Sequence, residues 1–289
     1  MTMQAVDFAH NDASAAPAHK DAVASVFRRY PQLTISPAIL VVLLAAWWLA
    51  SHVLGAPAYI VPPPEDVLRS TIAGLSRAPW DKASYWYHGG ITVWEALLGF
   101  AFGSAAGAVL GLGLSHWPLT GKSLYPYIVG FQSLPKVALA PLMVVWFGFG
   151  LEGKVFITAI ITFFPVLVNT MAGYQSVEPE RIELARSCNA SEWHLLAKVI
   201  IPSLLPFLFA GLGVASVLAI LGAVVGEFVG ASAGLGMLLM QYNQSMEIAP
   251  MFAIILLLGL IGFLMNYAVV MVERRYCFWA QRSTAAARP

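Results

Sequence analysis

Six long apolar stretches dominate the chain, and short polar connections separate them. The stretches are 35–54, 89–115, 124–149, 153–176, 200–226 and 250–272. A helix needs about 20 predominantly apolar residues to cross the hydrocarbon core of a bilayer. The stretches are continuous and lack the alternation of strands, and only helices or closed barrels satisfy the backbone in lipid. The pattern therefore predicts an all-α, polytopic membrane helix bundle with about six transmembrane helices.

The composition strengthens this prediction. Apolar residues make up 59% of the chain and charged residues 11%, whereas a soluble domain carries about 25% charged residues. The mean hydropathy of +0.73 leaves too little polar surface for a water-soluble protein. A formal net charge of +1 gives no general attraction to nucleic acid. We expect membrane lipid around the bundle and no nucleic-acid partner.

The distribution of Lys and Arg predicts the orientation of the bundle. With the N-terminus inside, eleven basic residues flank the inner ends, namely Lys20, Arg28, Arg29, Lys122, Arg181, Arg186, Lys198, Arg274, Arg275, Arg282 and Arg288. Four lie in outer segments, namely Arg69, Arg77, Lys82 and Lys154. Basic residues concentrate on the cytoplasmic side. Both termini are therefore predicted to be cytoplasmic, which requires an even number of crossings.

This orientation divides the chain into predicted regions. Residues 1–34 form a disordered cytoplasmic tail and 35–54 the first transmembrane helix. Residues 55–88 form a periplasmic loop with a short helix, 89–276 the main helical core, and 277–289 a second cytoplasmic tail. The two cysteines lie on segments predicted to be cytoplasmic, so we expect free thiols.

The second stretch carries a glycine every four residues. Gly99, Gly103, Gly107 and Gly111 share one face of a helix. Such a stripe allows another backbone to approach closely, which is how helices pack in lipid. The stripe predicts helix packing, either within the chain or at a seam between two subunits.

One polar segment lies between the fourth and fifth stretches. From Glu178 to Lys198 there are seven charged residues in a chain that otherwise has few. Pro179 suits the first turn of a helix, Asn189 tolerates the left-handed conformation that ends one, and Ser191 can cap the next. The segment predicts two short helices around a sharp turn, serving either as an ordinary connector or as a lever that docks into a partner.

A motif in this segment resembles the EAA loop of bacterial ABC importer permeases. The matching residues are Glu183-Leu184-Ala185, Asn189 and Val199-Ile200-Ile201-Pro202. Leu184 replaces an alanine of the family pattern and Asn189 replaces its glycine, although Asn can adopt the same backbone. The resemblance implies a coupling helix that seats in a groove of a separate ATPase. The implied coupling residues are Glu183, Leu184, Ala185, Arg186, Asn189, Ala190 and Pro202.

The resemblance extends over nearly the whole chain from about residue 60. Segments 61–64, 134–141, 146–148 and 226–236 are similar to permeases of the nitrate/sulfonate/taurine group. This implies the binding-protein-dependent ABC permease (type I importer) fold, with residues 89–276 as permease core and 178–198 as coupling loop. It also implies a multi-pass protein of the bacterial inner membrane.

The same resemblance implies partners and cofactors. They are a second copy of the chain in a homodimer, two copies of an ABC ATPase and a periplasmic substrate-binding protein. ATP and Mg would be bound by the ATPase, and no cofactor by this chain. The chain would then be a transport subunit and not an enzyme. It would form the translocation path for a small anionic or organic solute, of the sulfonate, nitrate or taurine kind. An ion-gradient-driven secondary transporter is the alternative.

Lys136 is a charged residue within an apolar stretch, bracketed by two prolines. Charged residues in a membrane usually face the bundle interior or water. Lys136 therefore either lines the pathway and favours an anionic solute, or forms an ion pair, for instance with Glu95, or reaches the interface. The other candidate pathway residues are Gln132, Trp146, Asn169 and Glu227. Glu227 either lines an outer gate or caps a helix end.

Other familiar motifs are rejected. Residues 120–123 read Thr-Gly-Lys-Ser, but His116 stands where a phosphate-binding loop needs its first glycine. The six histidines show no pair with metal-ligand spacing, and no metalloprotease or hydrolase motif is found. No catalytic residue and no metal ligand is predicted.

Overall fold

The computed structural model describes residues 32–279. The described residues up to Pro63 form one unit and those from Pro64 onward a second. The described residues contain helices and no strand, which confirms the all-α prediction. The predicted tails 1–34 and 277–289 lie largely outside the described residues, although the first helix already begins at Gln32.

The first unit contains one helix, α2, which spans Gln32–His52. The chain after α2 returns toward it, because the indole Nε1 of Trp47 donates a hydrogen bond to the carbonyl of Pro62 at 3.0 Å. The described apolar part, Ser36–His52, is shorter than the span-length helices of the second unit.

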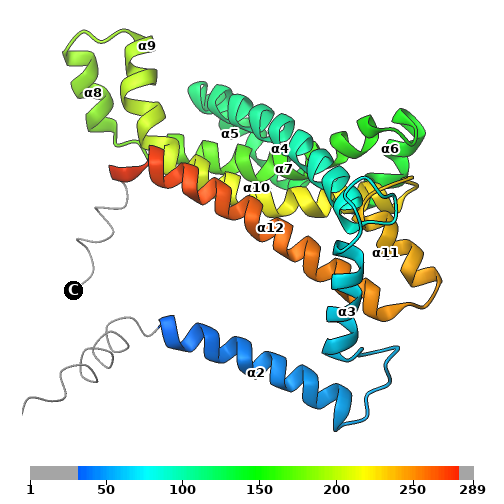
Figure 1. Cartoon of the computed structure of the whole chain (residues 1–289). Coiled ribbons are helices and arrows are strands. Elements are labelled where there is room, and N and C mark those ends of the chain that lie inside the picture. The colour runs from blue at the N-terminus through cyan, green and yellow to red at the C-terminus, as the bar shows by residue number, and fades with distance from the viewer. Residues whose placement is uncertain (1–31, 280–289) are drawn as a thin grey trace, which may run out of the picture. The chain divides into compact units, whose positions relative to one another are not determined.

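The second unit is a bundle of long and short helices (Figure 1). The elements before the long central helices are α3 (Pro64–Leu75), α4 (Tyr85–His116), α5 (Pro118–Ser133), the 3₁₀ turn η1 (Lys136–Leu139) and α6 (Ala140–Phe147). Those that follow are α7 (Leu151–Gln175), α8 (Pro179–Ser187), α9 (Glu192–Leu195), the π turn η2 (Leu196–Ile200), α10 (Ile201–Phe228), α11 (Leu235–Gln244) and α12 (Ile248–Tyr276). The short helix predicted within 55–88 is α3.

Within the described residues, four helices are long and apolar enough to cross a membrane. They are α4, α7, the continuous helix from Glu192 to Phe228, and α12. The segments 119–133 and 136–147 together make a fifth if a bent pair is one span. Every predicted stretch is helical, but the count of six crossings stays a prediction.

The third predicted stretch, 124–149, is not one continuous helix. Its two halves are bent by 77° around Leu134 and Pro135. A proline lacks a backbone N–H and keeps the preceding residue out of the helical conformation. Leu134 accordingly has ψ 139°, and the chain resumes as η1.

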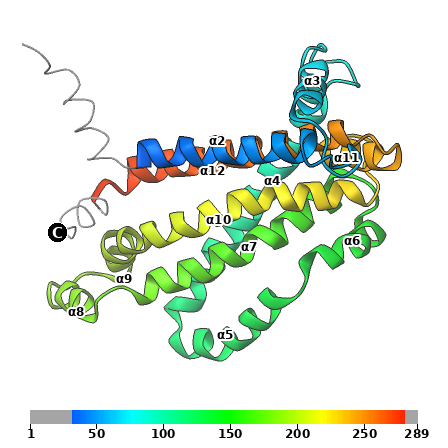
Figure 2. The ribbon, with the colours of Figure 1, turned by 90° about the horizontal axis from the view of Figure 1, so that it is seen from below.

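Helices α4, α7 and α10 form the tightly packed centre (Figure 2), and α7 packs against both of the others. The glycine stripe of α4 faces α7. A Cβ on Gly107 would lie 2.6 Å from the carbonyl oxygen of Phe163, and one on Gly111 would lie 2.8 Å from Cβ of Thr170. All four stripe glycines are buried. The stripe therefore packs within the chain, and the alternative of a subunit seam through these glycines is wrong.

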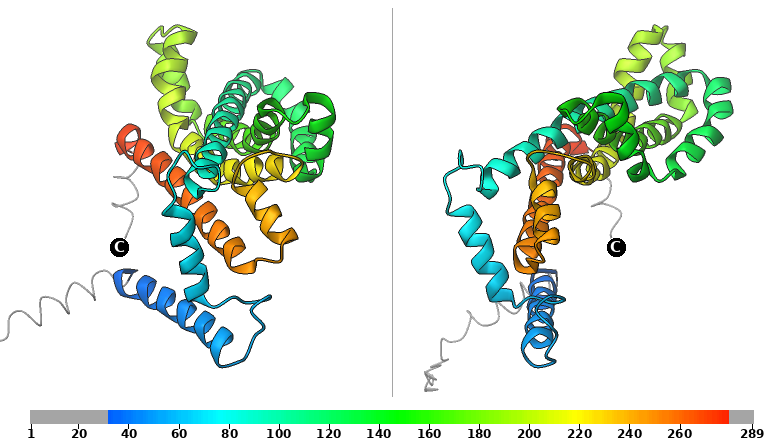
Figure 3. Two further views of the ribbon diagram at one scale, coloured as in Figure 1. Left: turned by 45° about the vertical axis from the view of Figure 1, so that its right-hand side comes forward. Right: turned by 90° about the vertical axis from the view of Figure 1, so that its right-hand side faces the viewer.

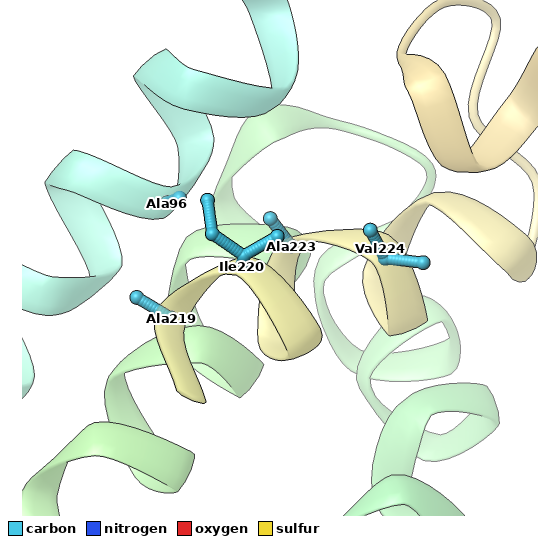
Figure 4. Packing of buried hydrophobic residues seen from close by; sticks show 5 residues of the cluster. All are labelled: Ala96, Ala219, Ile220, Ala223 and Val224. Carbon is cyan, nitrogen blue, oxygen red and sulfur yellow. The ribbon is translucent and has the colours of Figure 1, made fainter. Parts of the chain in front are cut away.

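On its other side, α10 packs against α4 and α12 through small residues. Ala96, Ala219 and Ala223 are 0% exposed and lie beside Ile220 and Val224 (Figure 4). Alanines bring the helix axes close, so dispersion contacts can replace the hydrophobic drive that lipid removes. The central helices connect two ends of the bundle, with α8 and α9 at one end and α6 and α11 at the other (Figures 1 and 3).

Candidate functional site

The segment 178–198 forms a short helix, α8, and a sharp turn, as predicted. The second helix is not short, because it continues from Glu192 to Phe228. Pro179 occupies the first turn of α8. Asn189 adopts the left-handed conformation with φ 56° and ends the helix. Ser191 caps α9 by accepting a hydrogen bond from the N–H of His194. The backbone geometry of the loop thus follows from three residues whose local chemistry requires it.

The loop combines an exposed surface with a buried base. The side chain of Leu184 is 67% exposed, and Glu183 and Arg186 are also exposed. Arg186 bridges the two helices by an ion pair to Glu192 at 3.3 Å. Ala185 is half-buried and joins the apolar cluster beneath α8, which is centred on Leu195, Ile200 and Leu204. The loop is therefore held on α7 and α10 while α8 presents an apolar side chain to the outside.

The helix continues through Pro202 without a break. One helix runs from Glu192 to Phe228, and the π turn Leu196–Ile200 precedes the proline directly. A wider turn accommodates the missing N–H of a proline and its clash with the carbonyl four residues earlier. The second half of the loop is therefore continuous with α10.

Trp193 is a surface feature that the sequence analysis missed. Its side chain is 71% exposed on α9, beside the α8 surface. The sequence signal for this surface was an indole within a highly charged segment, because exposed aromatic side chains mark contact surfaces. Leu184 and Trp193 are thus two large apolar side chains that this polar loop exposes.

Lys136 lies at the bend between α5 and η1. Its Nζ donates to the carbonyl of Gln132 at 2.6 Å and lies 5.0 Å from the ring centroid of Phe164. An apolar groove of about 900 Å³ between α4, α5, α6 and α7 includes Lys136 among its lining residues. The alternative ion pair of Lys136 with Glu95 is not formed, since Glu95 bonds to Lys154.

The other candidate pathway residues do not gather around Lys136. Gln132 is exposed on α5 and Trp146 is 62% exposed on α6. Asn169 is half-buried on α7 and donates to the carbonyl of Pro165 at 2.8 Å. None of these side chains lines the groove that contains Lys136. Within one copy of the chain they do not form a single site.

Glu227 lies at the end of α10 farthest from the loop and is 1% exposed. It accepts a hydrogen bond from the hydroxyl of Thr92 at 2.6 Å and another from the N–H of Gly236 in the first turn of α11. A carboxylate is favourable at a helix N-terminus, where free N–H groups point outward. Glu227 therefore holds the beginning of the next helix.

His88 and Thr92, both on α4, complete this attachment of α11. The N–H of Gly234 donates to Nδ1 of His88 at 2.9 Å, and the N–H of Leu235 donates to the Thr92 hydroxyl at 2.9 Å. The sequence analysis missed both residues, because a lone polar residue near the end of an apolar stretch resembles an interfacial one. Together with Glu227 they satisfy the first N–H groups of α11.

A buried contact between Lys154 and Glu95 lies next to this attachment. Nζ of Lys154 on α7 donates to Oε1 of Glu95 on α4 at 2.6 Å, and the side chains are 13% and 3% exposed. Lys154 was predicted only to lie in an outer segment. Removing either side chain is costly because a buried polar group then loses its hydrogen-bond partner. The pair therefore joins α4 to α7 at the end away from the loop.

No group of three metal-ligating side chains occurs in the part of the chain that the structure describes. The lookalike of a phosphate-binding loop, residues 120–123, lies inside helix α5 and not in a loop after a strand. Both cysteines are unbridged, with Cys188 exposed and Cys277 buried.

Comparison with known proteins connects this arrangement to transport. Residues 90–276 match the family described as "Binding-protein-dependent transport system inner membrane component". The chain is 35% identical over 243 residues to the riboflavin transport system permease protein RibX of Chloroflexus aurantiacus, covering 84% of this chain and 89% of that protein. It is 33% identical over 253 residues to the putative aliphatic sulfonates transport permease protein SsuC of Escherichia coli, covering 86% and 92%.

The fold is also found among solved structures. An inward-facing structure of the MetNI methionine ABC transporter contains a chain that superimposes with a TM-score of 0.54 at 21% identity. The match covers 64% of this chain and 94% of that one. At this identity the likeness shows the fold alone.

Proposed function

Because the chain belongs to the family of binding-protein-dependent transport system inner membrane components, it is a permease subunit of an ABC importer, and we propose that its loop 178–198 couples it to the ATPase. The observation that carries this proposal is the exposed Leu184 on a short helix held at the junction of α7 and α10. The family implies a separate ATPase and a substrate-binding protein as partners. Membership of this family argues against the alternative of a secondary transporter.

In this proposal, α8 seats in a groove of the ATPase and moves with it. Exposed Glu183 and Arg186 surround Leu184 with charge, while half-buried Ala185 and Pro202 transmit the motion by packing. Asn189 and Ala190 hold the turn, since the N–H of Ala190 donates to the carbonyl of Ala185 at 3.1 Å. The ATPase binds ATP and Mg, and this chain contributes no cofactor. The loop and both termini then face the cytoplasm.

The pathway for the solute is proposed to form between two copies of the chain. Large apolar side chains stay exposed along α6 and after it, with Val145 at 77%, Trp146 at 62% and Phe149 at 70%. A second copy covering this face would bring residues of both chains together. Light scattering of the detergent-solubilised complex should give two permease and two ATPase chains. A single permease per complex would contradict the homodimer.

The solute is proposed to be a small organic anion, of the class that includes sulfonates. Lys136 is the cation in the groove between α4, α5, α6 and α7, and six phenylalanines line the same groove. Its Nζ rests on a backbone carbonyl, an acceptor that an anionic group can replace. Names of relatives that mention riboflavin and aliphatic sulfonates support an organic solute.

Replacing Lys136 with Gln is expected to reduce ATP-driven uptake of the anionic solute by at least about tenfold, because a hydrogen bond to a charged group contributes about 1.5–3 kcal/mol. Uptake by proteoliposomes that contain the complete transporter measures this effect. Lys82→Gln removes a charge from an exposed position and should leave uptake unchanged. Full uptake by Lys136→Gln, with the ATPase still bound, would contradict the pathway role.

A further inference from the structure

One buried carboxylate oxygen of Glu95, close to Lys154 and Glu227, has no hydrogen-bond donor among the described residues. Glu95 is 2% exposed, and its Oε2 is buried without a partner among the described residues. An unsatisfied charged oxygen in a dry interior is costly. The Glu227 carboxyl group is a close neighbour of Glu95. Two carboxyl groups that both only accept hydrogen bonds cannot satisfy one another.

No neighbouring donor among the described residues is directed at this oxygen. Lys154 donates to the other oxygen of Glu95, Oε1. Both oxygens of Glu227 accept hydrogen bonds, Oε1 from the Thr92 hydroxyl and Oε2 from the N–H of Gly236. Glu227 thus has the bonding pattern of an ionised carboxylate at a helix N-terminus. Glu95 is the member of the pair that has a free position for a proton.

His88 does not supply that proton. Its Nδ1 accepts from the N–H of Gly234 at 2.9 Å and therefore carries no hydrogen. Its Nε2 then carries the ring hydrogen and lies 2.8 Å from the carbonyl of Lys82. This arrangement is the neutral imidazole, with both nitrogens occupied.

We propose that the folded permease holds one proton on Oε2 of Glu95, which donates a hydrogen bond to the carboxylate of Glu227. Among the described residues, the charged groups that act on Glu95 are Lys154 on α7 and Glu227 on α10. Lys154, Glu227 and protonated Glu95 together carry no net charge. The proton is a structural ligand, since it joins α4 to α10 where α10 holds the start of α11. This inference concerns the isolated chain and does not depend on the proposed coupling or solute.

Glu95→Gln separates this proposal from a simple ion pair. A glutamine can accept from Lys154 with its oxygen and donate to Glu227 with its amide, as the protonated acid does. Glu95→Ala can do neither. The apparent thermal midpoint of the purified full chain in detergent is measured for both variants between acidic and alkaline pH. At neutral pH, we expect the thermal midpoint of Glu95→Gln to be close to that of the wild type and the midpoint of Glu95→Ala to be well below it.

The pH dependence gives the sign that decides between the two arrangements. A proton that the folded chain holds and the unfolded chain releases stabilises the fold less as pH rises. The wild type should therefore lose stability at alkaline pH relative to Glu95→Gln, which keeps its donor at every pH. If Glu95 is instead an ionised partner of Lys154, Glu95→Gln is destabilised at neutral pH and approaches wild type as pH falls. That outcome would overturn the proposal.

Infrared difference spectra supply an independent measurement at neutral pH. The infrared band of a protonated carboxyl group is separate from the bands of carboxylates, and its frequency shifts in heavy water. The band of a protonated carboxyl should be present in the wild type and absent from Glu95→Gln. Glu152→Gln, an exposed position on α7, should keep it. Absence of the band from the wild type, or its loss in the control variant, would overturn the assignment.

Discussion

Replacing Leu184 with Asp is expected to abolish binding of the ATPase and, with it, ATP-driven uptake. Leu184 is the apolar side chain that α8 exposes between charged neighbours. Burying a leucine in a partner groove contributes about 1.5–3 kcal/mol, and an aspartate there would add the cost of an unpaired buried charge. The affinity should therefore fall by at least about 100-fold, measured by co-purification and by titration of the ATPase.

The control for this variant lies at the other end of the bundle. Met246 is 77% exposed and has φ 58°, a conformation that aspartate tolerates. Met246→Asp makes the same change in chemistry far from α8 and should leave ATPase binding intact. Because Leu184 is exposed, Leu184→Asp should also keep the thermal midpoint of the isolated chain. Wild-type binding by Leu184→Asp would show that α8 does not make the contact.

Replacing Gly103 with Ala is expected to destabilise the bundle by about 1–3 kcal/mol, as overpacking does in a close-packed interior. A Cβ at this position would overlap the hydroxyl of Thr162 and the carbonyl oxygen of Ala159, and would lie 2.9 Å from Cα of Ala159. Backbone atoms of α7 cannot move aside as the end of a flexible side chain can. The thermal midpoint of the chain and its yield in membranes measure the effect.

Gly113 on the same helix provides the matched control. A Cβ there would meet nothing within 4 Å in the chain, and alanine favours a helix over glycine by up to about 1 kcal/mol. Gly113→Ala should therefore be neutral or stabilising. Equal midpoints for Gly103→Ala and Gly113→Ala would contradict the close approach of α4 to α7.

The loop could be predicted from sequence because its geometry depends on local chemistry. Proline at a helix start, asparagine at a helix end and serine as a cap act through their own backbones, and Pro179, Asn189 and Ser191 act in this way. The glycine face of α4 was equally visible. Which helix covers that face depends on tertiary packing, so the sequence left open whether α7 or another subunit would do so.

The buried contact between Glu95 and Lys154 could not be predicted from sequence, because it too depends on tertiary packing. Glu95 and Lys154 are 59 positions apart in the sequence. The sequence suggested Lys136 as a partner for Glu95, because hydropathy does not give the relative depth of two residues. The bend at Pro135 was suggested by two prolines, yet the stretch 124–149 stays apolar throughout. Hydropathy therefore read the two halves as one span. Trp193 was overlooked because the charges around it dominated the interpretation of the segment.

The loop carries a cysteine that reports its position in the membrane. Cys188 is exposed at the end of α8. Cys277 is 1% exposed, and burial, together with the nearby Glu273 carboxylate, raises the pKa of its thiol. A thiol reacts as the thiolate, so Cys277 should react slowly. Cys277→Ser leaves Cys188 as the single thiol.

The most direct test of the account labels Cys188 of the Cys277→Ser chain with a membrane-impermeant maleimide. The account predicts no labelling in intact spheroplasts and rapid labelling in inside-out vesicles, with protection when the ATPase is bound. Labelling of Cys188 from outside intact spheroplasts would contradict the central claim that this loop meets the ATPase in the cytoplasm.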